Sequence, residues 1–182
     1  MTKYDVNKIK AQFPALNRTV WDKPLVYLDS AASMQKPQRV LDAINKNYSF
    51  NYSNVHRGLH KLSEEATSNY EGARRKIANF INCNEKEVIF TSGATAAINL
   101  IAYSWGLKNL SPGDEIIITI AEHHANIVPW QIIAEQKDVK IIAAKINPNE
   151  DFDAEIIKEL VTDKTKIIAF PHVSNVLGTV FP

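Results

Sequence analysis

Apolar residues in the second half of the chain form runs that predict the strands of a buried sheet. The runs at 115–120, 139–144 and 166–170 are continuous rather than alternating, which is typical of strands buried on both faces. Between these runs, 125–136 and 153–161 repeat apolar residues with the period of a helix. Strands that alternate with helices are typical of right-handed crossovers. We therefore expect an α/β fold with a doubly wound, mainly parallel sheet.

The first half of the chain has a less regular pattern. Residues 1–24 are assigned to an N-terminal segment, and 25–182 to the first part of a large domain. After 171 the sequence leads into no closing helix, so we expect this domain to be incomplete at its C-terminus. The predicted helices are 6–13, 37–48, 63–81 with Ser63 as its N-cap, and 94–105, and the predicted short strands are 25–28 and 88–91.

Composition and charge exclude several classes of protein. The chain has 182 residues, of which 45% are hydrophobic and 23% charged, as in ordinary globular proteins. The net charge of +1 gives no reason to expect nucleic acid or an anionic membrane as a partner. No apolar run approaches the ~20 residues of a membrane span, and the polar start lacks a secretory signal, so a cytoplasmic location is expected. A single cysteine, Cys83, excludes a disulfide framework and a cysteine-based zinc site, and no metal is expected.

Residues 91–97, Thr-Ser-Gly-Ala-Thr-Ala-Ala, join a predicted strand to a predicted helix. Gly93 permits a tight turn, and the amides after it belong to the first turn of the helix. A phosphate placed there would meet free N–H groups, the positive end of the helix dipole and the Thr95 hydroxyl. The alternative is a plain helix cap, because a single glycine is a weak fingerprint.

The run 122–130, Glu-His-His-Ala-Asn-Ile-Val-Pro-Trp, follows the strand predicted at 115–120. In open α/β sheets, ligands bind at the carboxyl ends of the strands. His123 and His124 lack the partners of a metal site. They could cap the helix that begins near Asn126, or one of them could stack on a flat cofactor ring and move protons. The neighbouring phosphate loop favours the active-site interpretation.

Three further segments contain candidate binding residues. His56 and Arg57 lie in an irregular loop that is suited either to the rim of a site or to solvent. Asn175 follows the last predicted strand and could bind a ring oxygen or a substrate carboxylate, or hold a turn. The small residues Ala31 and Ala32 leave room beside a ligand, or form a tight turn.

Together these motifs resemble the cysteine desulfurases of the SufS type, which belong to the class V aminotransferase family of pyridoxal-phosphate enzymes. The pattern at 57–60, Arg-Gly-Leu-His, and the run 122–130 are specific to this branch. The matching segments cover nearly the whole chain in the expected order: 27–33 with 35–37, 55–60, 90–95 with 98–100, 122–130 and 172–179.

The resemblance implies a homodimeric enzyme that converts L-cysteine to L-alanine and passes sulfur through a persulfide to an acceptor protein for iron–sulfur cluster assembly. By position, Thr95 and the Ala94 amide should hold the phosphate of pyridoxal 5′-phosphate. His123 should stack on the pyridine ring as the catalytic residue, and Asn175 should approach the phenolic oxygen and the substrate carboxylate. The substrate side or the dimer seam should be lined by Ala31, Ala32, His56, Arg57 and Asn175.

The resemblance also implies functional residues that the sequence lacks. The family's cofactor-binding aspartate, Schiff-base lysine, substrate-binding arginine and persulfide cysteine would all lie beyond residue 182, so we expect this chain to be inactive on its own. Two alternatives share the same motifs: a selenocysteine lyase or other class V enzyme, and a non-catalytic dimerising fragment. The open sheet edge after 166–170 predicts that the isolated chain aggregates or folds only in part.

Overall fold

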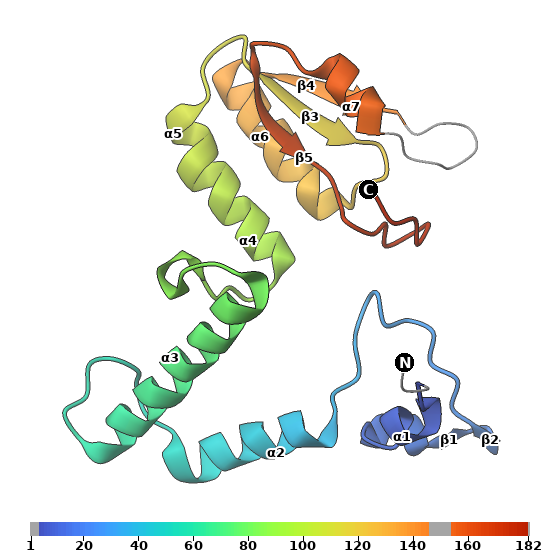
Figure 1. The fold of residues 1–182 in the computed structure, drawn as a ribbon, viewed down its shortest axis with the longest axis vertical. Helices are drawn as coiled ribbons and strands as arrows, with labels where there is room; N and C mark the ends of the chain where they lie inside the picture. Colours follow the sequence, from blue (N-terminus) through green and yellow to red (C-terminus); the bar gives the residue numbers. More distant parts are fainter. Residues whose placement is uncertain (1–3, 146–153, 182) are drawn as a thin grey trace. The chain divides into compact units, whose positions relative to one another are not determined.

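The computed structural model describes residues 4–145 and 154–181 (Figure 1). The chain divides into two compact units, Met1–Ile89 and Phe90–Pro182. The division after residue 24 that the sequence suggests falls inside the first unit and stays a prediction.

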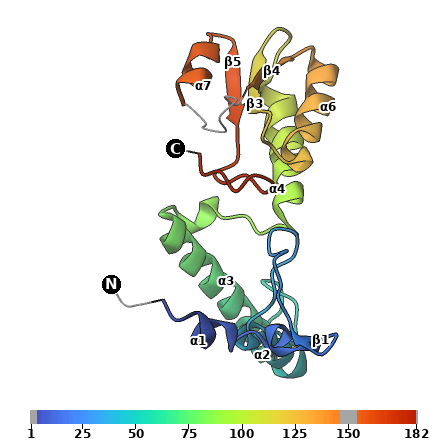
Figure 2. The same cartoon turned by 90° about the vertical axis from the view of Figure 1, so that its right-hand side faces the viewer.

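The second unit contains a three-stranded parallel sheet of order β4-β3-β5. From the central strand the chain passes to one neighbour and then crosses back to the other. Right-handed crossovers in opposite directions place their helices on opposite faces, and Figure 2 shows α6 and α7 on opposite sides of the sheet. The elements are β3 (Glu115–Thr119), α6 (Val128–Lys137), β4 (Lys140–Ala144), α7 (Ala154–Leu160) and β5 (Thr165–Ala169).

The central strand carries most of the core of this unit. Ile116 and Ile118 project to the α6 side, while Ile117, which alternation directs to the opposite face, is also fully buried. The helix predicted over 94–105 is present as α4 (Ala94–Ile101), which continues through the π-helical η4 (Ala102–Gly106) into α5 (Leu107–Asn109). The core cluster consists of Ala102, Leu110, Ile116, Ile118, Trp130, Ile133, Ala134 and Val139.

Strand β5 is an edge strand within the described residues, since it pairs only with β3. Ile168 on this strand is 43% exposed. Beyond it, a bridge between Val173 and Val180 closes a small loop. The parallel sheet and the open edge that the sequence predicts are therefore both present in the described structure.

The first unit is mostly helical, with one short antiparallel ribbon. Its longest element is α3 (Lys61–Ile81), which ends in a left-handed residue, Asn82. The other elements are α1 (Val6–Lys10), η1 (Pro14–Asn17), β1 (Thr19–Val20), β2 (Lys23–Pro24), α2 (Gln38–Lys46), η2 (Asn47–Asn51) and η3 (Glu85–Glu87).

Two strand predictions are wrong. Residues 25–28 and 88–91 are extended but pair with no strand among the described residues. Two of their side chains are largely exposed, Leu28 at 90% and Ile89 at 69%, although Val88 is buried. A strand requires a partner for its backbone groups, and an apolar run alone does not supply one.

The end of the first helix and the start of α3 differ from prediction. The first helix ends at Lys10 rather than 13, because Pro14 starts a separate 3₁₀ turn. The N-cap of α3 is His60, not Ser63, whose hydroxyl instead bonds the preceding loop. Position 153, where α7 was predicted to begin, lies outside the described residues. Among the described residues, no helix combines the length and apolar character that a membrane span requires.

Candidate functional site

The N-terminus of α4 is open to a ligand. Gly93 precedes the helix and has no side chain with which to cap it, and the ladder of helical bonds begins only when the Ala97 N–H donates to the Gly93 carbonyl at 3.0 Å. The first-turn amides of a helix have no partners within the helix, so the Ala94 and Thr95 N–H groups are oriented for an anion. The Thr91 hydroxyl donates to the Gly93 carbonyl at 3.0 Å and shapes the turn that presents them.

His123 caps the short helix η5 (His124–Asn126). Its Nδ1 accepts a hydrogen bond from the Ala125 N–H at 3.0 Å. Because Nδ1 is an acceptor here, the neutral imidazole carries its proton on Nε2. The capping role considered from the sequence is therefore real, and it leaves the ring face and the Nε2–H group for another partner.

The α4 N-terminus and the His123 loop line one pocket of about 290 Å³. Thr95 and Asn99 come from α4, whereas His123 and His124 come from the loop after β3. The structure thus brings together the phosphate-loop threonine and the histidine that the sequence placed at one sheet edge. The remaining lining residues are Ala125, Val128, Pro129 and Ile132, which form an apolar wall.

The donors in this pocket fit pyridoxal phosphate. Helix amides and a hydroxyl suit a phosphate dianion, and an imidazole beside an apolar wall suits the face of an aromatic ring. Ala94 and Thr95 would hold the phosphate, and His123 would lie against the ring.

Asn175 does not line this pocket. It is exposed in a turn that is organised by its neighbour Ser174, whose buried hydroxyl accepts from the N–H groups of Val176 at 3.3 Å and Leu177 at 3.1 Å. The Gly178 N–H donates to the Ser174 carbonyl at 3.0 Å. The turn considered from the sequence is therefore present, and the ligand role of Asn175 remains a prediction.

The other predicted rim residues belong to the first unit. Ala31 and Ala32 are exposed in a turn in which the Ser33 N–H donates to the Asp29 carbonyl at 3.1 Å. Arg57 is exposed. Their expected roles beside a substrate or at a dimer seam stay predictions.

His56 belongs to a charged cluster on α3. Its backbone has a positive φ of 74°, which is uncommon for a residue with a side chain. Its N–H donates to the Thr67 hydroxyl at 2.8 Å, and its Nε2 lies 2.7 Å from Oε1 of Glu71. Arg74 donates from Nε to Oε2 of the same carboxylate at 3.0 Å and lies over the Tyr70 ring at 5.0 Å.

This cluster corrects one expectation and adds one residue. An arginine on a helix is ordinarily expected to be solvated, but the Arg74 side chain is only 18% exposed. Glu71 was missed because no local pattern links it to His56, which lies fifteen positions earlier. The pKa of Glu71 is lowered, chiefly by the hydrogen bond from His56 and further by Arg74, against the opposing effect of burial.

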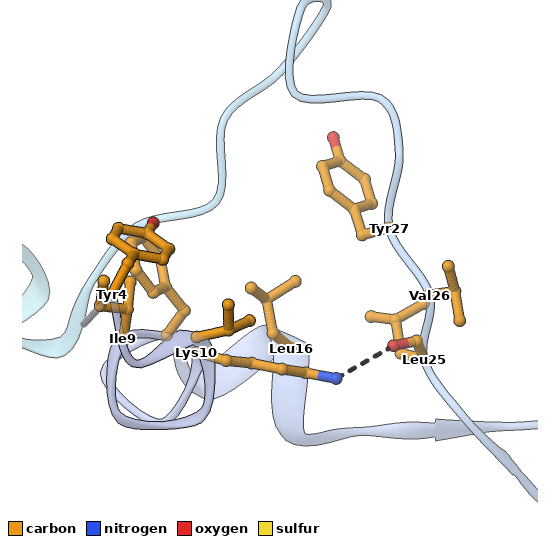
Figure 3. A pocket seen from close by; sticks show the side chains of 9 residues that line it. Tyr4, Ile9, Lys10, Leu16, Leu25, Val26 and Tyr27 are labelled. Atoms are coloured by element: carbon orange, nitrogen blue, oxygen red, sulfur yellow. Dashed lines mark hydrogen bonds between the residues drawn. The ribbon is translucent and has the colours of Figure 1, made fainter.

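The first unit also has an apolar pocket of about 340 Å³ between α1 and the extended segment 25–27 (Figure 3). The Lys10 ammonium already donates to the Leu25 carbonyl at 3.5 Å. The described lining includes no carboxylate and is mostly apolar, so this pocket offers apolar packing rather than chemistry. Within the described part of the chain, no group of three or more histidine, cysteine or acidic residues could hold a metal ion.

A parallel α/β layer with an open helix N-terminus and a histidine loop in one pocket is typical of enzymes that bind a phosphorylated cofactor. The class-V aminotransferase family model matches residues 26–182, and the chain therefore belongs to that family. The predicted fold class and the family resemblance are confirmed.

Individual relatives agree with this assignment. A probable cysteine desulfurase from Synechocystis is 47% identical over 175 residues, which are 96% of this chain and 42% of that relative. The cysteine desulfurase CsdA of Escherichia coli, in its S-sulfonic acid form, superposes with a TM-score of 0.81 at 38% identity over 97% of this chain and 43% of that chain. The apo structure of the cysteine desulfurase from Thermococcus onnurineus NA1 superposes with a TM-score of 0.88 at 30% identity. The match covers 99% of this chain and 43% of that chain. The chain thus spans less than half the length of these relatives.

Proposed function

We propose that this chain forms one wall of the active site of a pyridoxal-phosphate-dependent cysteine desulfurase, which releases L-alanine from L-cysteine and transfers the sulfur as a persulfide. The observation that carries the proposal is the pocket shared by Thr95 and His123. Identity of 47% to a relative named as a probable cysteine desulfurase supports the same activity.

Several residues in or beside the pocket have a defined task in this proposal. The Ala94 and Thr95 N–H groups and the Thr95 hydroxyl bind and orient the phosphate. The cofactor, when bound, withdraws electrons from the substrate α-carbon. His123 presents its ring face to the cofactor and holds a transferable proton on Nε2, while Val128 and Pro129 exclude water from one side.

The proposal extends to the partners of the whole enzyme. The sulfur acceptor is a protein of iron–sulfur cluster assembly, the enzyme is a cytoplasmic homodimer, and Asn175 contacts the ring oxygen and the substrate carboxylate. The substrate side or the dimer seam includes Ala31, Ala32, His56 and Arg57. These assignments rest on the motifs that resemble the SufS branch.

This chain alone should have no desulfurase activity. The described lining of the Thr95–His123 pocket includes neither a lysine nor a cysteine. With pyridoxal phosphate and L-cysteine, the purified chain should make no L-alanine above the background of the free cofactor. Robust turnover by the chain would contradict this expectation.

The activity itself is tested on the polypeptide as its source cells make it, with L-cysteine and L-selenocysteine as competing substrates. We expect L-alanine from L-cysteine, and a fall in kcat of about 10²-fold or more in His123→Ala. Cys83→Ser is the control, because Cys83 belongs to the first unit and is not among the residues that line the pocket, and this variant should keep full activity. Preference for L-selenocysteine, or no alanine from either substrate, would overturn the proposal.

A further inference from the structure

A chain of hydrogen bonds connects the His123 loop to the core of the second unit. The Trp130 Nε1–H donates to Oδ1 of Asn126 at 2.9 Å. The Asn126 Nδ2–H donates to Oε1 of Glu122 at 2.8 Å. The second carboxylate oxygen, Oε2 of Glu122, accepts the backbone N–H of His123 at 3.0 Å.

One end of this chain is fixed by packing. Trp130 is only 3% exposed and belongs to the core cluster around β3, so its indole N–H has a fixed position. Asn126, which accepts from this N–H, is half-buried. A hydrogen bond to a rigid donor costs little additional conformational entropy, so the order of the core extends to Asn126 and then to Glu122.

At the other end of this series of hydrogen bonds, His123 is held at two points, its backbone and its ring. Glu122 holds the His123 backbone N–H, and the Ala125 N–H holds the ring through Nδ1. Since both oxygens of the Glu122 carboxylate are occupied, the carboxylate cannot rotate away without breaking a bond. The ring is thereby kept in the tautomer that carries its proton on Nε2.

The middle position requires an amide. Asn126 donates to a carboxylate and accepts from an indole at the same time, which fixes the orientation of its amide group. An aspartate would still accept from Trp130 but would lose the donor and place a second negative charge beside Glu122. A leucine would leave the buried indole N–H without an acceptor.

We propose that Asn126 is a positioning residue for His123: together with Glu122 and Trp130, it holds the imidazole in one orientation and one tautomer toward the Thr95 pocket. This inference rests on the proposed function, in which His123 faces the cofactor. The imidazole ring should be fixed before the ligand binds. Ordering the ring during binding would cost conformational entropy and so lower the affinity for the ligand.

The test is the ring ¹⁵N spectrum of His123 in the polypeptide as its source cells make it, freed of bound cofactor, at pH 8.5, well above the ordinary pKa of an imidazole. In the unsubstituted chain, His123 should show an unprotonated Nδ1 and a protonated Nε2. Its neighbour His124, whose ring accepts no hydrogen bond within the described structure, should show averaged tautomers. In Asn126→Asp, the ring ¹⁵N shifts of His123 should become averaged like those of His124. Solvent exchange of the Ala125 amide proton should accelerate roughly tenfold, because its hydrogen bond to Nδ1 is weakened.

Asn109→Asp is the matched control. Within the described residues, the Asn109 side chain donates to the Trp105 carbonyl in its own helical segment, at 2.7 Å, and is not bonded to the Glu122–Trp130 network. The control should leave the His123 spectrum unchanged. Glu122→Ala is the second variant, for the case that Asn126→Asp folds poorly. Glu122 lies in a loop outside the core, and its replacement should change the His123 spectrum in the same way. An unchanged His123 spectrum in a folded Asn126→Asp or Glu122→Ala chain would overturn the inference.

A parallel titration separates this inference from the proposed function. If pyridoxine 5′-phosphate shifts the Thr95 and His123 resonances while Asn126→Asp leaves the ring spectrum unchanged, the positioning role is wrong and the proposed site stands. If Asn126→Asp changes the ring spectrum while the phosphate compound shifts neither residue, the positioning role stands and the proposed function fails.

Discussion

Nε2 of His56 lies 2.7 Å from Oε1 of Glu71, and the second oxygen of this carboxylate accepts from Nε of Arg74 at 3.0 Å. The carboxylate is therefore shared between an imidazole and a guanidinium. This arrangement connects the irregular loop around His56 to the middle of α3 and keeps the pKa of Glu71 below its ordinary value of 4.5.

Replacing His56 should raise the pKa of Glu71. Because the pKa is lowered in the folded state, the carboxylate contributes stability above its unfolded pKa, and that contribution is lost as the pH falls through the folded-state pKa. In His56→Ala, the chemical shift of the Glu71 carboxyl carbon should therefore report a higher titration midpoint. The free energy of unfolding should also fall less between roughly pH 5 and pH 2 than it does in the parent chain. Lys61→Ala, which removes only weak 3.9 Å contacts to Glu64 and Glu65, is the control. Identical Glu71 titrations in the parent chain and in His56→Ala would refute this explanation.

Gly58 is required for close packing of its loop against α3. A β-carbon at this position would collide with the Ser63 side chain, whose hydroxyl accepts the Gly58 N–H at 3.0 Å. Gly58→Ala should lower the free energy of unfolding by about 1–3 kcal/mol in urea titrations. Gly72→Ala is matched to it, since a β-carbon inside α3 meets only the end of Arg75 at 4.0 Å and should stabilise the helix by about 0.5–1 kcal/mol. Equal effects of the two substitutions would contradict the packing argument.

Two buried hydroxyls should respond in opposite ways to removal. The Thr119 hydroxyl, at the carboxyl end of β3, has no hydrogen-bond partner within the described residues, whereas Ser63 bonds both Gly58 and Asn54. Thr119→Val should be neutral or raise the Tm slightly, because it removes an unsatisfied polar group. Ser63→Ala should cost about 1–3 kcal/mol, because it leaves partners unsatisfied. A loss of stability in Thr119→Val comparable to that in Ser63→Ala would mean that Thr119 is bonded in solution.

The exposed edge of β5 should make the isolated chain self-associate. An unpaired strand edge with apolar side chains such as Ile168 is a template for pairing with another chain. Ile168→Lys should shift the sedimentation profile toward monomer, whereas Val161→Lys, which replaces an equally open side chain outside the strands, should not. A monodisperse parent chain with one cooperative thermal transition would show that the edge is protected.

The sequence predicted the part of the fold in which local pattern and tertiary packing agree. Continuous apolar runs such as 116–118 are buried on both faces, so β3 and its neighbours appear within a residue or two of the predicted bounds. The runs at 25–28 and 88–91 look similar but form no ladder with another strand among the described residues. Pairing depends on residues that are distant in sequence, and a local pattern carries no information about them.

The candidate site divides in the same way. Thr95 and His123 were predictable because Thr95 starts a helix and His123 follows the carboxyl end of a sheet strand, and both kinds of position commonly bind ligands. The bonds from Asn126 to Glu122 and Trp130 were not, because an asparagine at a helix start is equally suited to capping. Its partners are defined only by the turn that brings their side chains together.

The proposed function requires that the Thr95–His123 pocket bind the cofactor. The measurement is a titration of the ¹⁵N-labelled chain with pyridoxine 5′-phosphate, which lacks the aldehyde and so does not react with surface lysines. We expect saturable shifts at the Ala94 and Thr95 amides and at the His123 ring, with affinity reduced about three- to tenfold in Thr95→Val. Ser104→Ala, which removes a hydroxyl bonded to the Leu100 carbonyl, should bind like the parent chain. Shifts that scatter over the surface without saturating at these three residues would contradict the central claim.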